Sequence, residues 1–520
     1  MRLSYSLLAT LPSLALAAPT QDTQNKTGIE WTPCKIYGTR PGDCGKLMVP
    51  LDYTDDDSGE EIPLIISRVP ATKRPKKGSI LFNFGGPGAN GIEDLSVFAD
   101  HLLAATGGHH DLINVSPRGT NGTLTFSCFA DETQRSAGTS NFIAGNASDV
   151  APGEVWARAN IFTNTCAVAQ NETGRFVGTA FTARDHMRVV DALGEDGMLR
   201  YWGFSYGTIL GSTMIAMFPD KIDKIVLDGV ANPFEYYQNA ETELMTSTDD
   251  VFRGFCKGCV AAPKECPIAG NMTAEQLEQS LYAMIDNLKA NPIPVPDPNV
   301  LGGGTLITYS LVKATLLRQL YFPILWPSTA KLLAAVAAGS GEALAGGSGS
   351  DGGVGGDEAQ LGIKCSDVLQ HADKLTDVAP ILEQRHRLSR FGDTADQVLA
   401  QCAQWKLPAK ERYDGDFNNV KKTKNPVLIV NNRYDPVTPL VSARNVSQTF
   451  EGSVLLEQNG YGHISLVQGS ICTAKAIRSY FMEGKLPKEG TVCDVKAKLF
   501  SGKDGWEEVI KELNGNSTST

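Results

Sequence analysis

Residues 200–219 read RYWGFSYGTILGSTMIAMFP, and the glycine-flanked serine at their centre constrains the fold more than any other stretch. A strand-like apolar run precedes Gly203, and a helix-like apolar run follows Gly207. Small residues are needed on both sides of such a serine, because larger side chains would clash in so tight a turn. The pattern predicts a sharp strand-to-helix turn that exposes Ser205; a turn with a merely packing serine is the alternative.

Strand-like and helix-like segments alternate on both sides of this turn. Residues 181–194 have a helical period of apolar side chains. The strand-like runs that end in turns lie at residues 78–88, 111–119, 199–207, 224–233 and 425–439. This alternation predicts an α/β protein with a mostly parallel sheet flanked by helices.

The pattern changes between residues 235 and 415, where helical periodicity dominates. Within this part, residues 339–358 form a low-complexity run of Gly and Ser, which is typical of a flexible loop. The β/α pattern then resumes. We therefore predict an α/β core in two parts, a helical cap inserted between them, and a C-terminal tail; the corresponding residues are 18–234 and 416–500 for the core, 235–415 for the cap and 501–520 for the tail.

The first 17 residues have the form of a secretory signal peptide. Arg2 precedes an apolar run, and Ala15-Leu16-Ala17 supplies an A-x-A cleavage site. A transmembrane anchor fits less well, because the run is short and contains Pro12. Two prolines and a lysine interrupt the most apolar later segment, residues 320–339. We expect a secreted, extracellular protein with no membrane partner.

The net charge and the cysteine content limit which partners and which compartment the protein can have. The formal net charge of −11 argues against a nucleic-acid partner, which would favour a basic surface. Eleven cysteines in an oxidising compartment should mostly be paired, with one left over. Nearest neighbours in the sequence suggest Cys34–Cys44, Cys128–Cys166, Cys365–Cys402 and Cys472–Cys493, with one bridge inside the trio Cys256, Cys259 and Cys266.

A metal or redox CxxC at Cys256 and Cys259 is the alternative, but no second CxxC or His pair lies nearby. We therefore expect no metal and no organic cofactor. Asn-x-Ser/Thr sequons fit a secreted glycoprotein and occur at Asn25, Asn114, Asn121, Asn146, Asn171, Asn271, Asn445 and Asn516. Asn114 suits glycosylation least, since it lies in an apolar run and Pro117 follows its serine.

A serine nucleophile needs a base, and the chain has seven histidines. His463 lies in EQNGYGHISLV, a glycine-rich loop after the last strand-like run, where a hydrolase with this chain order needs its base. A surface-loop histidine is the alternative. His109 and His110 have the context of a solvated turn, and His186 falls on an amphipathic helix.

The imidazole in turn needs a carboxylate to hold its tautomer. Asp435 follows a buried strand in VLIVNNRYDPVTP, although an Asp that caps the turn before Pro436 is the alternative. Asp228 in IVLDG also ends a strand and is the rival candidate. We prefer Asp435 because its segment leads directly to the His463 loop. The order Ser205, Asp435, His463 is that of the α/β hydrolases.

A tetrahedral intermediate on this serine would need backbone N–H donors. One expected donor is Tyr206, the residue after the nucleophile. The other is Gly86 in FGGPG, residues 84–88, whose glycines allow the backbone to approach a substrate. A plain glycine turn is the alternative for this segment.

Together the segments resemble the secreted tripeptidyl aminopeptidases, α/β hydrolases related to the prolyl aminopeptidases. The segments that carry the resemblance are FNFGGPGANG, PRGTNG, YWGFSYGTILG, FPDKIDKIVLDGVANP, RYDPVTP and GYGHISL. The resemblance runs in order from about residue 30 to residue 500. It implies an α/β-hydrolase core with a helical cap, a serine exopeptidase activity, and peptide substrates with a free N-terminus. It places the nucleophile on Ser205, the acid on Asp435 and the base on His463.

This chain departs from its relatives at two positions: they often carry His in place of Phe84 and Asp in place of Ser116. In related aminopeptidases, carboxylates of the cap bind the substrate's α-amino group. The candidates here are Glu241, Glu243, Asp249 and Asp250, with ordinary solvated charges as the alternative, so we do not predict them as site residues.

Two other functions remain open on the same framework. One is an esterase or lipase, because the fold does not determine the substrate. The other is a catalytically silent hydrolase-like binding protein, although such proteins usually lack a triad member.

Overall fold

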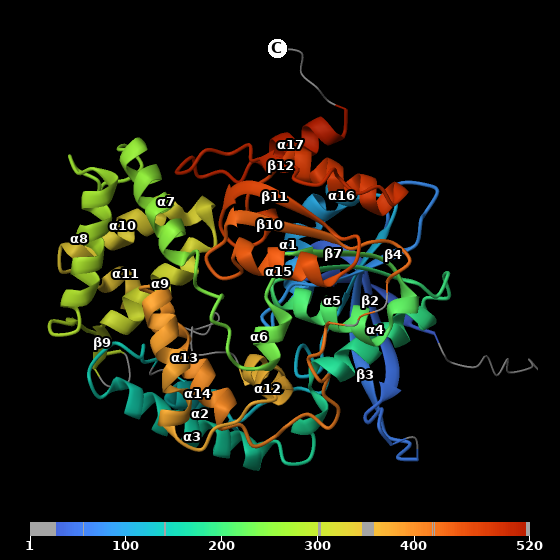
Figure 1. Ribbon diagram of the computed structural model, residues 1–520, viewed down its shortest axis with the longest axis horizontal. Helices are drawn as coiled ribbons and strands as arrows, with labels where there is room; N and C mark the ends of the chain where they lie inside the picture. The colour runs from blue at the N-terminus through green and yellow to red at the C-terminus, as the bar shows by residue number, and fades with distance from the viewer. Residues whose placement is uncertain are drawn as a thin grey trace, which may run out of the picture.

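A computed structural model describes residues 28–515, except residues 56, 140–141, 300–302, 346–357, 419 and 421. The expected signal peptide lies outside the described residues, as does most of the Gly/Ser run. Figure 1 shows a sheet flanked by helices, with a separate group of helices beside it.

The sheet has ten strands in the order β1-β2-β3-β5-β4-β6-β7-β10-β11-β12. Their bounds are β1 Glu30–Ile36, β2 Arg40–Pro50, β3 Glu61–Val69, β4 Ser79–Asn83, β5 Asp111–Val115, β6 Leu199–Phe204, β7 Ile222–Asp228, β10 Leu428–Tyr434, β11 Val454–Tyr461 and β12 Val492–Asp494. Strands β1 to β3 pair antiparallel, as do β3 and β5, whereas all pairs from β5 to β12 are parallel. Residues at the carboxyl ends of β4, β6, β7, β10 and β11 therefore meet at one edge.

Helices cover both faces of the sheet (Figure 1). One face packs α1 Gly91–Thr106, α16 Ile471–Glu483 and α17 Trp506–Leu513 in one apolar cluster. The other packs α4 Thr179–Ala192, α5 Tyr206–Met217 and α15 Leu440–Thr449. Because Trp506 and Val509 of α17 are buried in the first cluster, residues 506–513 belong to the core, although the sequence analysis placed them in the tail.

The helical part of the chain has an apolar cluster of its own. This cluster is built largely by α7 Thr248–Ala261, α8 Ala274–Asn287, α9 Tyr309–Leu320 and α10 Trp326–Ala337, with the hairpin β8 Ile293–Pro296 and β9 Gly304–Ile307. Further elements here are α6 Pro233–Tyr237, α11 Glu342–Ala345, α12 Glu358–Asp367, α13 Leu375–Leu388 and α14 Asp396–Ala403. Two helices come from earlier in the chain, α2 Glu132–Thr139 and α3 Ala151–Ala169, and α3 lies beside α13 and α14 (Figure 1). Val155 and Ala159 of α3 pack against Ala400 of α14, so this layer draws on residues before 235.

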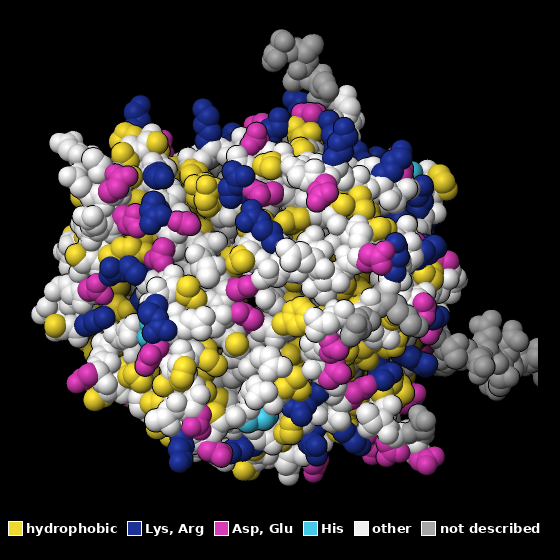
Figure 2. Space-filling view, in the orientation of Figure 1, with side chains coloured by type: hydrophobic (Ala, Val, Ile, Leu, Met, Phe, Trp, Pro, Cys, Tyr) yellow, Lys and Arg dark blue, Asp and Glu magenta, His cyan; other side chains and the backbone are white. Residues whose placement is uncertain are grey.

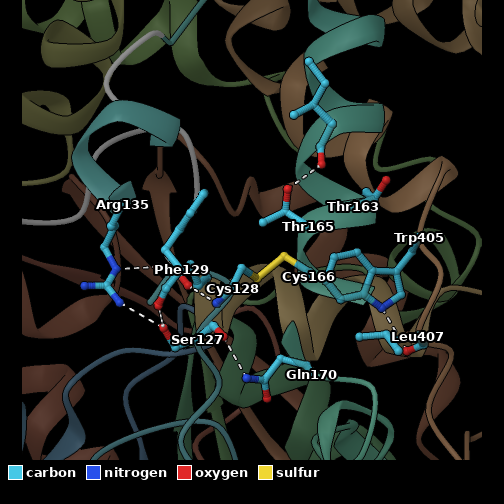
Figure 3. The surroundings of a disulfide bond; sticks show 12 residues. Ser127, Cys128, Phe129, Arg135, Thr163, Thr165, Cys166, Gln170, Trp405 and Leu407 are labelled. Carbon is cyan, nitrogen blue, oxygen red and sulfur yellow. Dashed lines mark hydrogen bonds and ion pairs between the residues drawn. A yellow bond between two sulfur atoms is a disulfide. The ribbon is translucent and has the colours of Figure 1, made fainter. Parts of the chain in front are cut away.

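Five disulfides join neighbouring segments: Cys34–Cys44, Cys128–Cys166, Cys259–Cys266, Cys365–Cys402 and Cys472–Cys493. The four pairs predicted from sequence proximity are confirmed, and Cys256 of the remaining trio is a buried free thiol. Figure 3 shows Cys128–Cys166 with Ser127, whose carbonyl accepts from the Gln170 side chain at 2.7 Å.

On the face drawn in Figure 2, basic and acidic side chains are interspersed. Within the described residues no single helix has the length and apolarity to cross a membrane; residues 309–320 and 323–337 meet these criteria only as a pair, bent by 118°. Asn114 is buried in β5, so its sequon is closed to glycosylation in the folded protein.

Candidate active site

Ser205 occupies a strained turn between β6 and α5. Its φ of 56° and ψ of −123° lie in a region that non-glycine residues rarely adopt, which typically costs about 1–3 kcal/mol. A Cβ added at Gly203 would lie 2.2 Å from the carbonyl oxygen of Gly207, and one at Gly207 would lie 2.4 Å from that of Asn83. Steric crowding thus explains both glycines, and the turn points Ser205 away from the strand.

The glycine-rich loop after β4 lies directly against Ser205. A Cβ built on Gly85 would lie 2.8 Å from the Cβ of Ser205 and 3.3 Å from its Oγ. The N–H of Gly85 donates to Asn83 Oδ1 at 3.0 Å, whereas the N–H of Gly86 donates to no described protein group. The N–H of Tyr206 is in the first turn of α5 and has no intrahelical partner. Two unused donors are therefore close to the serine.

Aromatic stacking explains Phe84, one of the two positions at which this chain differs from its relatives. The Phe84 ring stacks on Phe204 with centroids 5.5 Å apart, and it also stacks on Phe82 and Phe98. Aromatic packing therefore supports the loop where a polar side chain is common in the relatives. Ser116, the second departure, is fully buried, and its hydroxyl has no hydrogen-bond partner among the described residues.

Asp435 and His463 are brought together at the ends of β10 and β11. The Nδ1 atom of His463 lies 3.0 Å from Oδ2 and 3.1 Å from Oδ1 of the fully buried Asp435. The carboxylate also accepts from the N–H groups of Val437, Thr438 and Ile464 at 2.8–3.1 Å. These donors hold the carboxylate in place, and the carboxylate orients the imidazole through Nδ1.

Asp228, the rival acid, has different partners. Its Oδ1 accepts from the Ser465 N–H at 2.8 Å, and its Oδ2 lies 2.5 Å from Ser465 Oγ and 3.3 Å from Trp202 Nε1. Burial raises the pKa of this carboxyl to about 7. Asp228 therefore lies within the site but holds the backbone beyond the histidine instead of the imidazole.

Two contacts that could not be predicted from the sequence bring the helical part of the chain onto this site. Tyr321, at the end of α9, packs its ring edge-on to the His463 ring with centroids 4.9 Å apart, and its carbonyl accepts from the His463 N–H at 2.9 Å. The Gln360 amide of α12 donates to the carbonyl of Gly86 at 3.2 Å. Helical elements thus contact both the glycine-rich loop and the loop that carries His463, here called the base loop.

Helix α12 also supports Tyr206. Its last residue, Asp367, accepts from the Thr179 N–H at 2.8 Å and from the Tyr236 hydroxyl at 3.0 Å. The hydroxyl of Thr179 lies 2.5 Å from that of Tyr206. Burial raises the pKa of the Asp367 carboxyl to about 6.

The four acidic residues weighed as amine ligands are already engaged within the protein. Glu241 pairs with Lys364 and Arg385, Glu243 binds Asn232, Ser442 and Asn445, Asp249 binds Tyr282 and Arg390, and Asp250 pairs with Arg253.

A carboxyl that the sequence analysis did not single out is Asp94, in the first turn of α1 directly after the glycine-rich loop. Its half-buried side chain has no hydrogen bond or ion pair to a described residue, and burial raises its pKa to about 7. The sequence feature that could have pointed to Asp94 is its position just after FGGPGANG.

The described residues contain no group of three or more His, Cys, Asp or Glu side chains arranged to hold a metal ion. The strand order and the positions of Ser205 after β6, Asp435 after β10 and His463 after β11 are those of the α/β hydrolases. The fold predicted from the sequence is confirmed: the protein is an α/β hydrolase.

Comparison with known proteins places the chain more closely within this class. Residues 387–493 match the family described as TAP-like protein. The chain is 27% identical to the tripeptidyl aminopeptidase of Streptomyces lividans, over 90% of this chain and 87% of that protein. It is also 27% identical to serine protease Hip1 of Mycobacterium tuberculosis (89% and 91%) and to carboxylesterase B of the same organism (93% and 91%).

Among solved structures, Candida antarctica lipase A in its closed state matches with a TM-score of 0.34 and 10% identity, over 94% of this chain and 90% of that one. The family match and the sequence similarities confirm the resemblance to the tripeptidyl aminopeptidases, and the protein is a serine hydrolase.

Proposed function

We propose that this protein is a secreted serine exopeptidase that releases short N-terminal peptides, specifically tripeptides, from peptide substrates. The observation that carries the proposal is the helical cover of the site, in which Tyr321 contacts His463 and Gln360 contacts Gly86. A cap over a hydrolase site restricts access to short or unfolded chains. The similarity to a tripeptidyl aminopeptidase supports this class of substrate. In this proposal residues 235–415 form the cap.

The chemistry follows from the proposed triad. The Ser205 Oγ attacks the scissile carbonyl as Nε2 of His463 takes its proton, while Asp435 stabilises the imidazolium. The N–H groups of Gly86 and Tyr206 would bind the oxyanion of the tetrahedral intermediate. His463 then gives the proton to the leaving amine, and the acyl-enzyme forms. Water, deprotonated by His463, hydrolyses the ester and restores Ser205.

An aminopeptidase must also bind the substrate's α-ammonium group. Asp94 is the carboxylate best suited to this role, because it is half-buried, follows the glycine-rich loop and has no protein cation bound. The charge of Arg318 in α9 lowers the pKa of Asp94, which supports a position of this carboxyl near the proposed cap. Substrate ammonium would compensate a carboxylate that burial disfavours.

Two features support secretion. The first 17 residues have the pattern of a cleavable signal peptide. The five disulfides suit an oxidising compartment, since such bonds are rare in cytosolic proteins.

Ester hydrolysis is the second candidate, favoured by the similarity to a carboxylesterase. Four substrates separate the two: a free-amino tripeptide p-nitroanilide, its N-acetylated twin, a single-residue p-nitroanilide and p-nitrophenyl butyrate. Wild type and Ser205→Ala are assayed side by side. We expect cleavage of the free-amino tripeptide alone among the anilides, lost in the variant. Turnover of the ester alone would contradict the peptidase proposal, and preference for the single-residue anilide would contradict tripeptide release.

A further inference from the structure

Strand β7 ends between the nucleophile turn and the base loop. Its last residue, Asp228, is fully buried, and its carbonyl accepts from the Ser205 N–H at 3.1 Å. The next N–H, that of Gly229, donates to the carbonyl of Val430 in β10 at 3.1 Å. The backbone at Asp228 therefore joins the strand that presents the serine to the strand that leads to Asp435.

The Asp228 carboxyl reaches a third segment, the loop that carries the histidine. It binds both the N–H and the hydroxyl of Ser465, two residues beyond His463. Between them, Ile464 has a φ of 66°, a left-handed conformation unfavourable for a β-branched residue. Such a conformation persists only where its surroundings hold it. Asp435 holds the Ile464 N–H on one side, and Asp228 holds Ser465 on the other.

We propose that Asp228 is a positioning residue for the reaction. It holds the strained loop that carries His463 in place relative to the turn that carries Ser205. It acts through Ser465 on His463, and through its own carbonyl on Ser205. The inference rests on the proposed roles of Ser205 and His463, but it does not depend on which acyl substrate the enzyme prefers.

Because of the Ser465 hydroxyl, the hydrogen bond between Ser465 and Asp228 can form whether the Asp228 carboxyl is charged or neutral. The hydroxyl can donate to a charged carboxylate or accept from a neutral carboxyl, since a hydroxyl is both donor and acceptor. The groups that face the Asp228 carboxyl are Trp202 from β6, Ser465 from the base loop and, at longer range, Asp435. Burial and the charge of Asp435 both raise the pKa of Asp228, to about 7. Asparagine would imitate the neutral form.

The test compares four variants: Asp228→Ala, Asp228→Asn, Ser465→Ala and, as a matched control, Asp223→Asn. Asp223 is also a buried aspartate, near the start of the same strand, where it pairs with Arg200 away from the site. Activity is measured with whichever of the four substrates wild type cleaves, and folding by circular dichroism and thermal unfolding. The rate of Ser205 labelling by a fluorophosphonate gives a readout that is independent of substrate.

We expect Asp228→Ala to lower kcat and the labelling rate by about 10²-fold with little change in KM, as displacement of a catalytic group by about 1 Å does. Asp228→Asn should recover much of this loss, and Ser465→Ala should fall between the two. Because the buried Asp228 carboxyl changes charge near pH 7 beside the loop that carries His463, the kcat/KM profile around that pH should change in Asp228→Asn and stay as in wild type in Asp223→Asn.

Several results would overturn the inference. One is a folded Asp228→Ala protein with unchanged kcat and labelling rate. Another is an equal loss of kcat in Asp223→Asn, which would indicate general destabilisation of β7. If Asp228→Ala does not fold, an unshifted pH profile in Asp228→Asn together with full activity of Ser465→Ala would refute it. Failure of the peptidase proposal would instead show as ester-only turnover in wild type, with these ratios preserved.

Discussion

Replacement of Gly85 by alanine tests whether the glycine-rich loop forms part of the reaction site. The added methyl carbon would lie 2.8 Å from both the carbonyl oxygen of Phe204 and the Cβ of Ser205. Both atoms belong to the rigid nucleophile turn, so the loop itself must shift. The φ of Gly85 is 99°, which also disfavours any side chain.

The magnitude follows from these two effects. A left-handed φ costs an L-residue about 1–2 kcal/mol, and overpacking of a close contact costs about 1–3 kcal/mol. If the loop stays in place, the free energy of unfolding therefore falls by about 2–5 kcal/mol. If the loop moves away, Gly86 moves with it, and loss of one oxyanion donor lowers kcat by about 10²–10³-fold.

The assay measures kcat and KM on the substrate that wild type cleaves, together with thermal unfolding. Gly197→Ala is the matched control, because Gly197 has a φ of 68° but no atom within 4 Å of an added methyl group. We expect the control to lose stability alone, and Gly85→Ala to lose kcat as well. Equal kcat in the two variants would refute the assignment of this loop to the oxyanion hole.

Three further changes have outcomes set by the structure. Asp435→Asn should lower kcat by about 10⁴-fold, as removal of the carboxylate partner does in serine proteases, and a loss smaller than about tenfold would point to another acid. Cys365→Ser combined with Cys402→Ser should lower the free energy of unfolding by about 2–4 kcal/mol, and an unchanged midpoint in denaturant would contradict a stabilising bridge. The carboxyl of Asp367 has a raised pKa of about 6 in the folded protein, so its stabilising contribution is complete below pH 4 and is lost as the pH rises through 6. Asp367→Asn should therefore flatten the decline in stability between pH 4 and pH 7; an unaltered slope would show that Asp367 does not titrate there.

Features that depend on residues close together in the chain could be predicted from the sequence. The turn at Ser205 needs glycines at fixed spacing, and the structure shows the backbone atoms that exclude larger residues there. The disulfides join cysteines that are neighbours in the sequence, so proximity alone selected four pairs correctly. The alternation of strands and helices specified a parallel sheet because it leaves few ways to connect the strands.

No pattern in the sequence indicates the contacts between distant segments. The Ser465 and Asp228 pair spans 237 positions, and Gln360 reaches Gly86 across 274. Asp228 could be noticed as a strand-end carboxylate, yet only the fold shows that its partner is a backbone N–H beyond the histidine. Helix α3 falls within residues 18–234, the predicted first part of the core, whereas its Val155 and Ala159 pack on Ala400 of α14.

Long-range contacts also connect the proposed cap to the candidate active site. The carboxylate of Glu358, the first residue of α12, binds the backbone N–H of Cys128 and the side chain of Arg135. From that anchored end, α12 reaches Gly86 through Gln360 and the Tyr206 hydroxyl through Asp367 and Thr179. One helix of the region predicted as the cap thus contacts the glycine-rich loop directly and Tyr206 through Thr179. A substitution that displaces α12 should therefore change kcat as well as KM, whereas a cap that only selected substrates would change KM alone.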